Sequence, residues 1–316
     1  MVNVESRWQD SEMRVSQVRD RNGVVVSGFP IRGTKRFVVA IDGVGSDTHD
    51  GLSWATAKRT MSDVFDDLSS NDEIYFVGNV REELSTPAGV FDVKIIGAGN
   101  SPRHADGHTG NNGYSASTWK PPASPTAATA LLNVRQQGWE FHNILFDCPV
   151  DAAAVKLLRD AGAGDLERDA GHAKFIACRF DSGKVGIENA GGAGFVLVKG
   201  CRFYRLTESG GAGIKCTSTS VAVPLNWQII DNHFANNASH ILSSMSYSLI
   251  KGNTFGRFTA TLSVDIDDQP SANQGEYNII TENYLTGTYN GTAYPAGSNN
   301  EWAGNQNVAG VTTADP

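Results

Sequence analysis

The stretch FIACRFDSGKVGIENAGGAGFVLVKGCRF, residues 175–203, carries the same short pattern at both of its ends. An apolar run is followed by two small or polar residues, then by Asn or Cys, any residue, and Phe. The copies along the chain are FHNILF (141–146), FIACRF (175–180), VKGCRF (198–203), IIDNHF (229–234), IKGNTF (250–255) and ITENYL (280–285). Their last residues are 34, 23, 31, 21 and 30 residues apart. Each spacing suits one coil of a β-solenoid, which takes about 20 to 35 residues.

Aligning the copies places like residues in the same columns. The position two before the end reads Ile144, Cys178, Cys201, Asn232, Asn253 and Asn283, and the final position reads Phe146, Phe180, Phe203, Phe234, Phe255 and Leu285. Parallel strands stack about 4.8 Å apart, so equivalent side chains form ladders. The columns therefore predict an amide ladder at a turn and an aromatic ladder in the core.

Earlier segments extend the stack toward the N-terminus. DEIYFVG (72–78) and FDVKIIGAG (91–99) are short β-rich runs ended by glycine. Between them and the first strand, Met61, Val64, Phe65 and Leu68 recur at helical spacing. We expect a helix that caps the open end of the solenoid, because an uncapped end exposes core and strand edges.

Residues 36–83, RFVVAIDGVGSDTHDGLSWATAKRTMSDVFDDLSSNDEIYFVGNVREE, resemble the entry segment of the pectate-lyase-like β-helix superfamily. Similar segments occur in viral tailspikes and other phage virion proteins, and residues 99–125 and 298–305 also resemble phage structural proteins. The resemblance implies an all-β fold, a right-handed parallel β-helix with an N-terminal capping helix. The superfamily contains lyases, hydrolases, epimerases and structural proteins, so the fold does not determine the function.

The chain divides into three regions. Residues 1–35 are polar and lack the coil pattern, so we expect either an arm that attaches to a virion, with Trp8, Met13 and Val15 as contacts, or a disordered tail. Residues 36–290 form the β-helix, with inserted loops at 99–128 and 154–171. Residues 291–316 are rich in Gly, Asn and Thr and predict an irregular tail.

Composition excludes some classes of partner. The 316 residues are 40% hydrophobic and 19% charged, with a net charge of −8. This acidic balance argues against nonspecific nucleic-acid binding, and no apolar run is long enough for a membrane span or a signal peptide. The four cysteines lack CxxC spacing and are expected to be buried free thiols. We expect a virion protein made in the host cytoplasm.

A catalytic set is hard to assemble. The sequence shows no pair of arginines on one strand, as β-helix lyases use. It also lacks the full set of Asp-containing segments found in pectin hydrolases. The best remaining acids are Asp265 and Asp267, two apart and so on one side of a strand, with Glu276 nearby. They could form an acid/base pair, but an acidic turn edge is the interpretation we favour.

Two patterns raise metal binding. Asp42, Asp47 and Asp50 could hold Ca²⁺, although a loop in which Asp side chains bond the local backbone fits equally and is preferred. His104 and His108 beside Asp106 lack the helical context of a metal site. No cofactor is expected. His233 and His240 are interpreted as turn or surface residues.

Aromatic residues outside the ladders are candidates for contact with a glycan or another subunit. Trp119, Tyr114, Trp302 and Tyr294 fall in stretches interpreted as loops. A ring there can stack on a sugar or pack against a neighbouring subunit, and we favour subunit packing.

Three functions stay open. The first is a non-enzymatic phage virion protein: a homotrimeric capsid decoration (cement) protein held by its N-terminal arm to capsid or tail proteins. The alternative is a short tailspike or receptor-binding protein that binds or depolymerises a host surface polysaccharide. A secreted cellular carbohydrate enzyme is the third, and the missing signal peptide argues against it.

Overall fold

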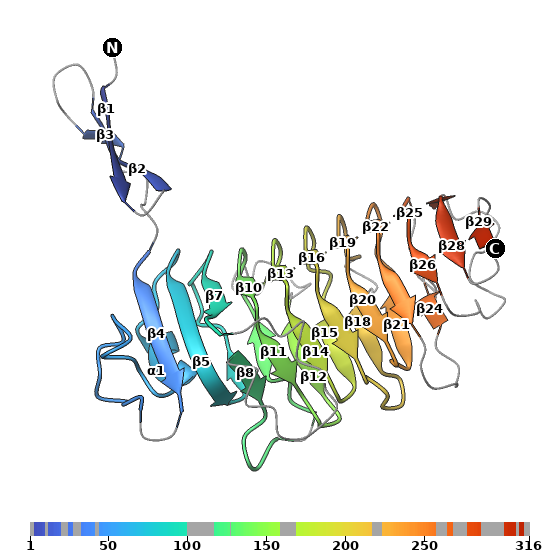
Figure 1. The fold of residues 1–316 in the computed structure, drawn as a ribbon, viewed down its shortest axis with the longest axis horizontal. Coiled ribbons are helices and arrows are strands. Elements are labelled where there is room, and N and C mark those ends of the chain that lie inside the picture. The colour runs from blue at the N-terminus through green and yellow to red at the C-terminus, as the bar shows by residue number, and fades with distance from the viewer. Residues whose placement is uncertain are drawn as a thin grey trace.

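A computed structural model describes residues 3–9, 12–19, 25–27, 33–41, 44–99, 117–126, 128–158, 169–216, 223–256, 264–267, 277–285, 300–307 and 310–312. Within these ranges the protein is a right-handed parallel β-helix, elongated along the stacking direction (Figure 1). Across the same ranges, no helix is long and apolar enough to span a membrane.

Each coil contributes up to three short strands, one to each face of the solenoid. The first face contains β4 (Lys35–Ala40), the start of β5 (Glu73–Arg81), β7 (Lys94–Gly97), β10 (Glu140–His142), β13 (Lys174–Ile176), β16 (Leu197–Lys199), β19 (Gln228–Ile230), β22 (Leu249–Lys251), β25 (Ile279–Thr281) and β27 (Glu301–Ala303).

After a bend, the same sheet continues as the second face. It contains the end of β5, then β8 (Ser117–Lys120), β11 (Leu145–Asp147), β14 (Arg179–Asp181), β17 (Arg202–Tyr204), β20 (His233–Ala235), β23 (Thr254–Gly256), β26 (Tyr284–Leu285) and β28 (Asn305–Asn307), to which β29 (Gly310–Thr312) pairs antiparallel.

The third face is a separate sheet in the described part of the chain. It contains β6 (Leu84–Ser85), β9 (Leu132–Val134), β12 (Ala153–Leu157), β15 (Val185–Asn189), β18 (Ala212–Cys216), β21 (Ser239–Ser243) and β24 (Val264–Asp267).

The bend between the first and second faces explains the amide column. One residue per coil takes a left-handed conformation there, as at Ala177 (φ 54°) and Asp231 (φ 56°), and the next side chain turns into the core. In the C-terminal coils that side chain is an asparagine. The Nδ2 of Asn232 donates to Asn253 Oδ1 at 3.0 Å, Asn253 donates to Asn283 at 3.0 Å, and Asn283 donates to Asn305 at 2.9 Å. The predicted amide ladder is confirmed and extends one coil further.

The aromatic column is confirmed as well. The rings of Phe146, Phe180, Phe203, Phe234 and Phe255 stack in order, with centroids 4.6–5.2 Å apart and planes within 16° of parallel. These rings are fully buried, and Leu285 continues the column. Stacked rings at the strand spacing fill the space between the three faces, so this column forms the centre of the core.

The helix near the N-terminus is short. α1 (Met61–Asp66) begins after Thr60, whose hydroxyl accepts the backbone N–H of Asp63, and its buried Met61, Val64 and Phe65 join the core. The carboxylate of Glu82 accepts the N–H groups of Met61 and Ser62, which satisfies free donors of the first turn. The capping role expected for this segment stays a prediction.

Several predicted boundaries are wrong. β8 lies inside the segment assigned to the loop 99–128, and most of β12 lies inside the loop 154–171. The coil also continues past residue 290 through β27 and β28, where an irregular tail was expected. In each case the strand is only three to five residues long. Pairing with the neighbouring coil, which the local sequence does not reveal, determines the strand.

The N-terminal region contains three strands. β1 (Asn3–Gln9), β2 (Glu12–Arg19) and β3 (Val25–Ser27) form an antiparallel sheet of their own, drawn at the N-terminal end in Figure 1. Trp8 lies on β1, and Met13 and Val15 lie on β2, with Trp8 opposite Met13. The side chains of this sheet lie outside what the structure describes, so the attachment contacts stay a prediction.

A groove along the first face

The turn that precedes the first face repeats one backbone conformation in successive coils. The residue two positions before each strand has φ between 53° and 76°: Asn71, Asp92, Gly138, His172, Phe195, Asn226, Tyr247 and Tyr277. Backbone bonds join neighbouring turns, as from Phe195 N–H to the Leu225 carbonyl at 2.8 Å. We call this set of eight residues the turn column. Because the backbone is the same at each position, side chains leave it in the same direction.

A second outward column runs parallel to the turn column. It consists of the first residues of the strands, which pair in register: Glu73, Lys94, Glu140, Lys174, Leu197, Gln228, Leu249 and Ile279. We call it the strand column. The residue between the two columns in each coil points inward, as with Trp139 and Trp227, which are fully buried. The surface that the two columns border contains two hollows, and we call this surface the groove.

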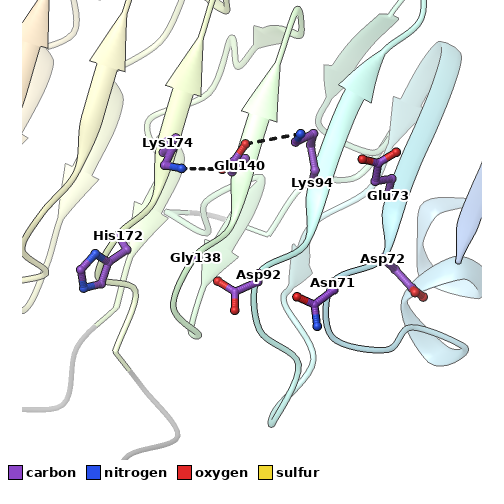
Figure 2. Close-up of a pocket in the computed structure, with 9 residues that line it drawn as sticks. All are labelled: Asn71, Asp72, Glu73, Asp92, Lys94, Gly138, Glu140, His172 and Lys174. Carbon is purple, nitrogen blue, oxygen red and sulfur yellow. Dashed lines mark hydrogen bonds and ion pairs between the residues drawn. The ribbon is translucent and has the colours of Figure 1, made fainter. Parts of the chain in front are cut away.

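The N-terminal part of the groove is charged. A hollow of about 490 Å³ is lined by Asn71, Asp72, Glu73, Asp92, Lys94, Gly138, Glu140, His172 and Lys174, as Figure 2 shows. The Oδ1 of Asp92 lies over Gly138, where an added Cβ would be 1.9 Å away. The glycine thus leaves room for the carboxylate of the neighbouring coil and interrupts the turn column.

Glu140 is the centre of the charged part. Its carboxylate accepts from Lys174 Nζ at 2.6 Å and contacts His142 Nε2 at 3.0 Å, and Lys94 Nζ lies 3.8 Å away (Figure 2 shows the two lysines). Partial burial raises the pKa of Glu140, but the bonds from Lys174 and His142 and the nearby Lys94 charge outweigh it, so the pKa lies below the ordinary value. The group is ionised near neutrality and is a poor proton donor.

The C-terminal part of the groove is aromatic. A hollow of about 330 Å³ is lined by Asn226, Trp227, Gln228, Tyr247, Ser248, Leu249, Tyr277 and Ile279. The rings of Tyr247 and Tyr277 stack at 5.0 Å, and the rings of His172 and Phe195 stack at 4.9 Å. Phe195 and Tyr247 are 57% and 58% exposed, and Tyr277 is 45% exposed. Large exposed rings in a row mark a binding surface more often than an isolated one does.

The two tryptophans proposed from sequence as glycan or subunit contacts do not lie in this groove. Trp119 is fully buried on β8, where it stacks on Phe146 at 6.0 Å and donates its Nε1–H to the Glu82 carbonyl. Trp302 is 6% exposed on β27 and pairs with Ile280 in an inward column. The interpretation of both tryptophans as loop residues is wrong, because each lies on a strand in a buried column of the core. Tyr114 and Tyr294 lie outside the described residues.

Two of the candidate acids lie on a different face from the groove. Asp265 and Asp267 lie on β24 of the third face, and Asp267 pairs with Leu242. Their side chains, and Glu276 altogether, fall outside the described part of the chain. The acid/base proposal for these three residues therefore stays a prediction.

The candidate Ca²⁺ loop has local partners for two of its acids. Asp50 accepts from Thr56 Oγ1 at 2.6 Å and from Leu52 N–H at 3.0 Å, and the Thr56 bond, followed by the Leu52 bond, lowers the pKa of Asp50. Asp47 lies 3.7 Å from Arg59 Nε. Asp42 lies outside the described ranges, as do His104, Asp106 and His108, and the described residues hold no group of three or more metal-binding side chains.

His240 differs from its expected surface position. It is fully buried beside Phe234 and Phe255, and its Nδ1 is 3.1 Å from Asn237 Nδ2. On the neighbouring strand the equivalent residue is Gly213, where an added Cβ would be 2.7 Å from the Phe234 ring. The histidine therefore belongs to the core.

Sequence reasoning missed the groove aromatics, although a signal exists. His172, Phe195, Tyr247 and Tyr277 each lie eight residues before the final position of their coil pattern. Extending the alignment by a few residues toward the N-terminus would have placed them in one column.

The fold defines the class of the protein as a right-handed parallel β-helix. No family model matches the sequence, and the comparison with curated proteins gives no match. Among solved structures, the pectate lyase Pel9A superposes with a TM-score of 0.59 at 11% identity, covering 87% of this chain and 68% of that one. Pectin methylesterase from carrot gives 0.54 at 13% identity, covering 87% and 82%. The complex of XylC with xylose gives 0.52 at 11%, covering 81% and 66%. At these identities the similarity shows the fold alone.

Proposed function

We propose that the chain binds an extended polysaccharide along the first-face groove, as a short tailspike-like receptor-binding protein. The observation that carries this proposal is the row of exposed rings in the turn column at Phe195, Tyr247 and Tyr277. Exposed aromatic rings offer rigid apolar surface with low conformational freedom, which suits them to contact the C–H groups of sugars.

The shape of the groove supports a linear ligand. The eight positions of the turn column span seven strand spacings, or about 34 Å. Successive positions repeat one backbone geometry, so an extended chain can follow the two columns from coil to coil. Proteins with this fold also support the proposal by their names: a pectate lyase, a pectin methylesterase and a protein solved with xylose.

Binding without cleavage is the form we propose for this groove. The Asp72 carboxylate is held by the N–H groups of Thr34 and Ser69 and by Arg36 Nε. Glu140 is held by Lys174 and His142 and has a lowered pKa. Glycoside hydrolysis needs a carboxylic acid with a raised pKa to protonate the leaving oxygen, and the pKa of Glu140 is shifted in the opposite direction.

The test is a binding assay on purified host capsule and O-antigen polysaccharides, with xylan and homogalacturonan as further probes. The double variant Tyr247→Ala/Tyr277→Ala should weaken binding by at least about tenfold. Tyr284→Ala is the matched control, because Tyr284 is 43% exposed but lies on the second face. Equal losses in both variants, or no binding to any probe, would contradict the proposal.

The same polysaccharides decide between binding and cleavage. Incubation with the wild-type chain should leave their size distribution unchanged. Depolymerisation that is lost in Asp265→Asn/Asp267→Asn would instead make those two acids, with Glu276, the catalytic candidates.

A second candidate function is capsid decoration, a non-enzymatic role in which a homotrimer is attached through its N-terminal region. The observation that favours it is the separate antiparallel sheet of β1, β2 and β3, which makes no strand pairing with the β-helix in the described residues. Mapping the protein on purified particles tests this role. Copies at local threefold positions of the shell would support decoration, and copies at the tail would support the receptor-binding role.

A further inference from the structure

The hollow of about 330 Å³ in the aromatic part of the groove has apolar side chains from both columns. Tyr247 and Tyr277 line it from the turn column. Leu249 and Ile279 line it from the strand column, where they pair in register on strands about 4.8 Å apart. Ile279 is 45% exposed. The aliphatic pair and the two rings together make the hollow an apolar recess in an otherwise open surface.

The polar groups beneath the hollow are already bonded within the protein. The Ser248 hydroxyl donates to the Ser246 carbonyl at 3.0 Å and accepts from the backbone N–H of Trp227 at 3.0 Å. The Nε1–H of Trp227 donates to the Ala193 carbonyl at 2.8 Å. A sugar hydroxyl placed against these groups would lose its water without gaining an equivalent partner, whereas a methyl group would gain apolar contact. The recess therefore favours an apolar substituent.

Two side-chain amides lie at one end of the same hollow. Asn226 contributes one from the turn column, and Gln228 contributes the other from the strand column, where it pairs with Leu249. Amides both donate and accept hydrogen bonds. The strand column thus changes from an amide at Gln228 to aliphatic side chains at Leu249 and Ile279 within two strand spacings. A few polar groups beside apolar walls are typical of sites for small ligands.

We propose that this hollow is a subsite for the acetamido group of an N-acetylated sugar unit in the bound polysaccharide. The inference rests on the proposed function and adds the class of sugar. An acetamido group carries an amide and a methyl group side by side. The amide bonds to Gln228, and the methyl group contacts Leu249 and Ile279. Only this substituent enters the hollow, so the polymer itself follows the two columns along the long axis of the solenoid.

The experiment titrates the full chain with three glycosides, followed by saturation-transfer NMR. They are methyl 2-acetamido-2-deoxy-β-D-glucopyranoside, methyl β-D-glucopyranoside, which lacks the acetamido group, and methyl α-L-rhamnopyranoside, which carries a ring methyl group without an amide. We expect the acetamido glycoside to bind at least about tenfold more tightly than the glucoside, with the strongest saturation at its acetyl methyl group. Equal affinities for these two, no detectable binding of the acetamido glycoside, or tighter binding of the rhamnoside would overturn the proposal.

Leu249→Thr/Ile279→Thr is the decisive variant, because threonine keeps a preference for strands and removes the aliphatic wall. It should weaken binding of the acetamido glycoside by at least about tenfold. Gln228→Leu should weaken it by at least about threefold through loss of the amide bond, and Leu249 already holds a leucine at the next position of the column. The matched control is Leu145→Thr, which is partly exposed on the second face and pairs with Thr118; it should bind like the wild type.

Far-ultraviolet circular dichroism checks that each variant is folded. Undiminished binding in either hollow variant, or an equal loss in the control, would overturn the subsite. The groove function is judged separately, by the polysaccharide titration of Tyr247→Ala/Tyr277→Ala. Polysaccharide binding that depends on the tyrosines, without a preference for the acetamido glycoside, would remove the subsite and leave the groove function in place.

Discussion

Replacing Asn253 by alanine tests how the solenoid is held together. The Oδ1 atom of Asn253 accepts from the backbone N–H of Asn232 at 2.9 Å and from its Nδ2 at 3.0 Å. The Nδ2 atom of Asn253 donates to the Ile229 carbonyl at 2.9 Å and to Asn283 Oδ1 at 3.0 Å. All four bonds are buried and depend on the side chain.

The expected cost follows from that count. A hydrogen bond contributes about 1 kcal/mol net, and a buried donor left without a partner costs about 1–3 kcal/mol. Asn253→Ala removes the acceptor of the buried Asn232 N–H. The free energy of unfolding should therefore fall by about 4 kcal/mol. Equilibrium denaturation followed by far-ultraviolet circular dichroism measures the change.

The control is Thr254→Ala, next in the chain and partly exposed, which should cost well under about 1 kcal/mol. A loss below about 1 kcal/mol in Asn253→Ala would refute the view that the ladder amides stabilise the fold. Unfolding in more than one transition would show that coils unfold separately, as solenoids can. The free energy of the first transition would then be compared between the two variants.

Three further predictions concern the core and the charged part of the groove. Phe203→Ala should lower the free energy of unfolding by about 3–5 kcal/mol, because the ring is fully buried between two stacked neighbours; a heat-denaturation midpoint near that of the wild type would contradict this. Burial raises the pKa of Cys148 to about 12 and raises that of Cys216 as well, so neither thiol should react with a disulfide reagent at pH 8 until denaturant is added. The pKa of Glu140 is lowered in the folded state, so the ionised carboxylate stabilises the fold above pH 4.5, and this stabilisation is lost as the pH falls through the folded pKa. The difference in unfolding free energy between wild type and Glu140→Gln should therefore shrink in that range. A difference that stays constant would argue against the ion pairs.

The solenoid was predictable because each coil places the same kind of side chain at the same position. The amide column and the phenylalanine column recur at one position per coil, so six short segments were enough to indicate the parallel stack. Cys178 and Cys201 show why the column tolerates exchange: their thiols donate to the Phe141 and Phe175 carbonyls at 3.3 and 3.4 Å. Asparagine Nδ2 makes the corresponding bond in later coils.

The groove was less predictable because its residues vary. The strand column changes from Glu and Lys to Leu and Ile along the axis, and the turn column changes from Asp to Tyr. No single residue type repeats, so local patterns did not reveal a shared surface. The sequence interpretation of Trp119 and Trp302 failed because their neighbours in the sequence suggested an exposed position. Both are surrounded by residues typical of loops, yet each continues a buried column of the neighbouring coil.

The constant offset between the turn column and the core ladder has a consequence for evolution. Loops between coils differ in length, but from Gly138 to Tyr277 eight residues separate each turn position from its final ladder position. Duplication or loss of one whole coil would keep every column continuous and change the groove by one strand spacing, about 4.8 Å. Ligand length would then be inherited as a number of coils, while the aromatic or polar residue at each turn position could be altered one coil at a time.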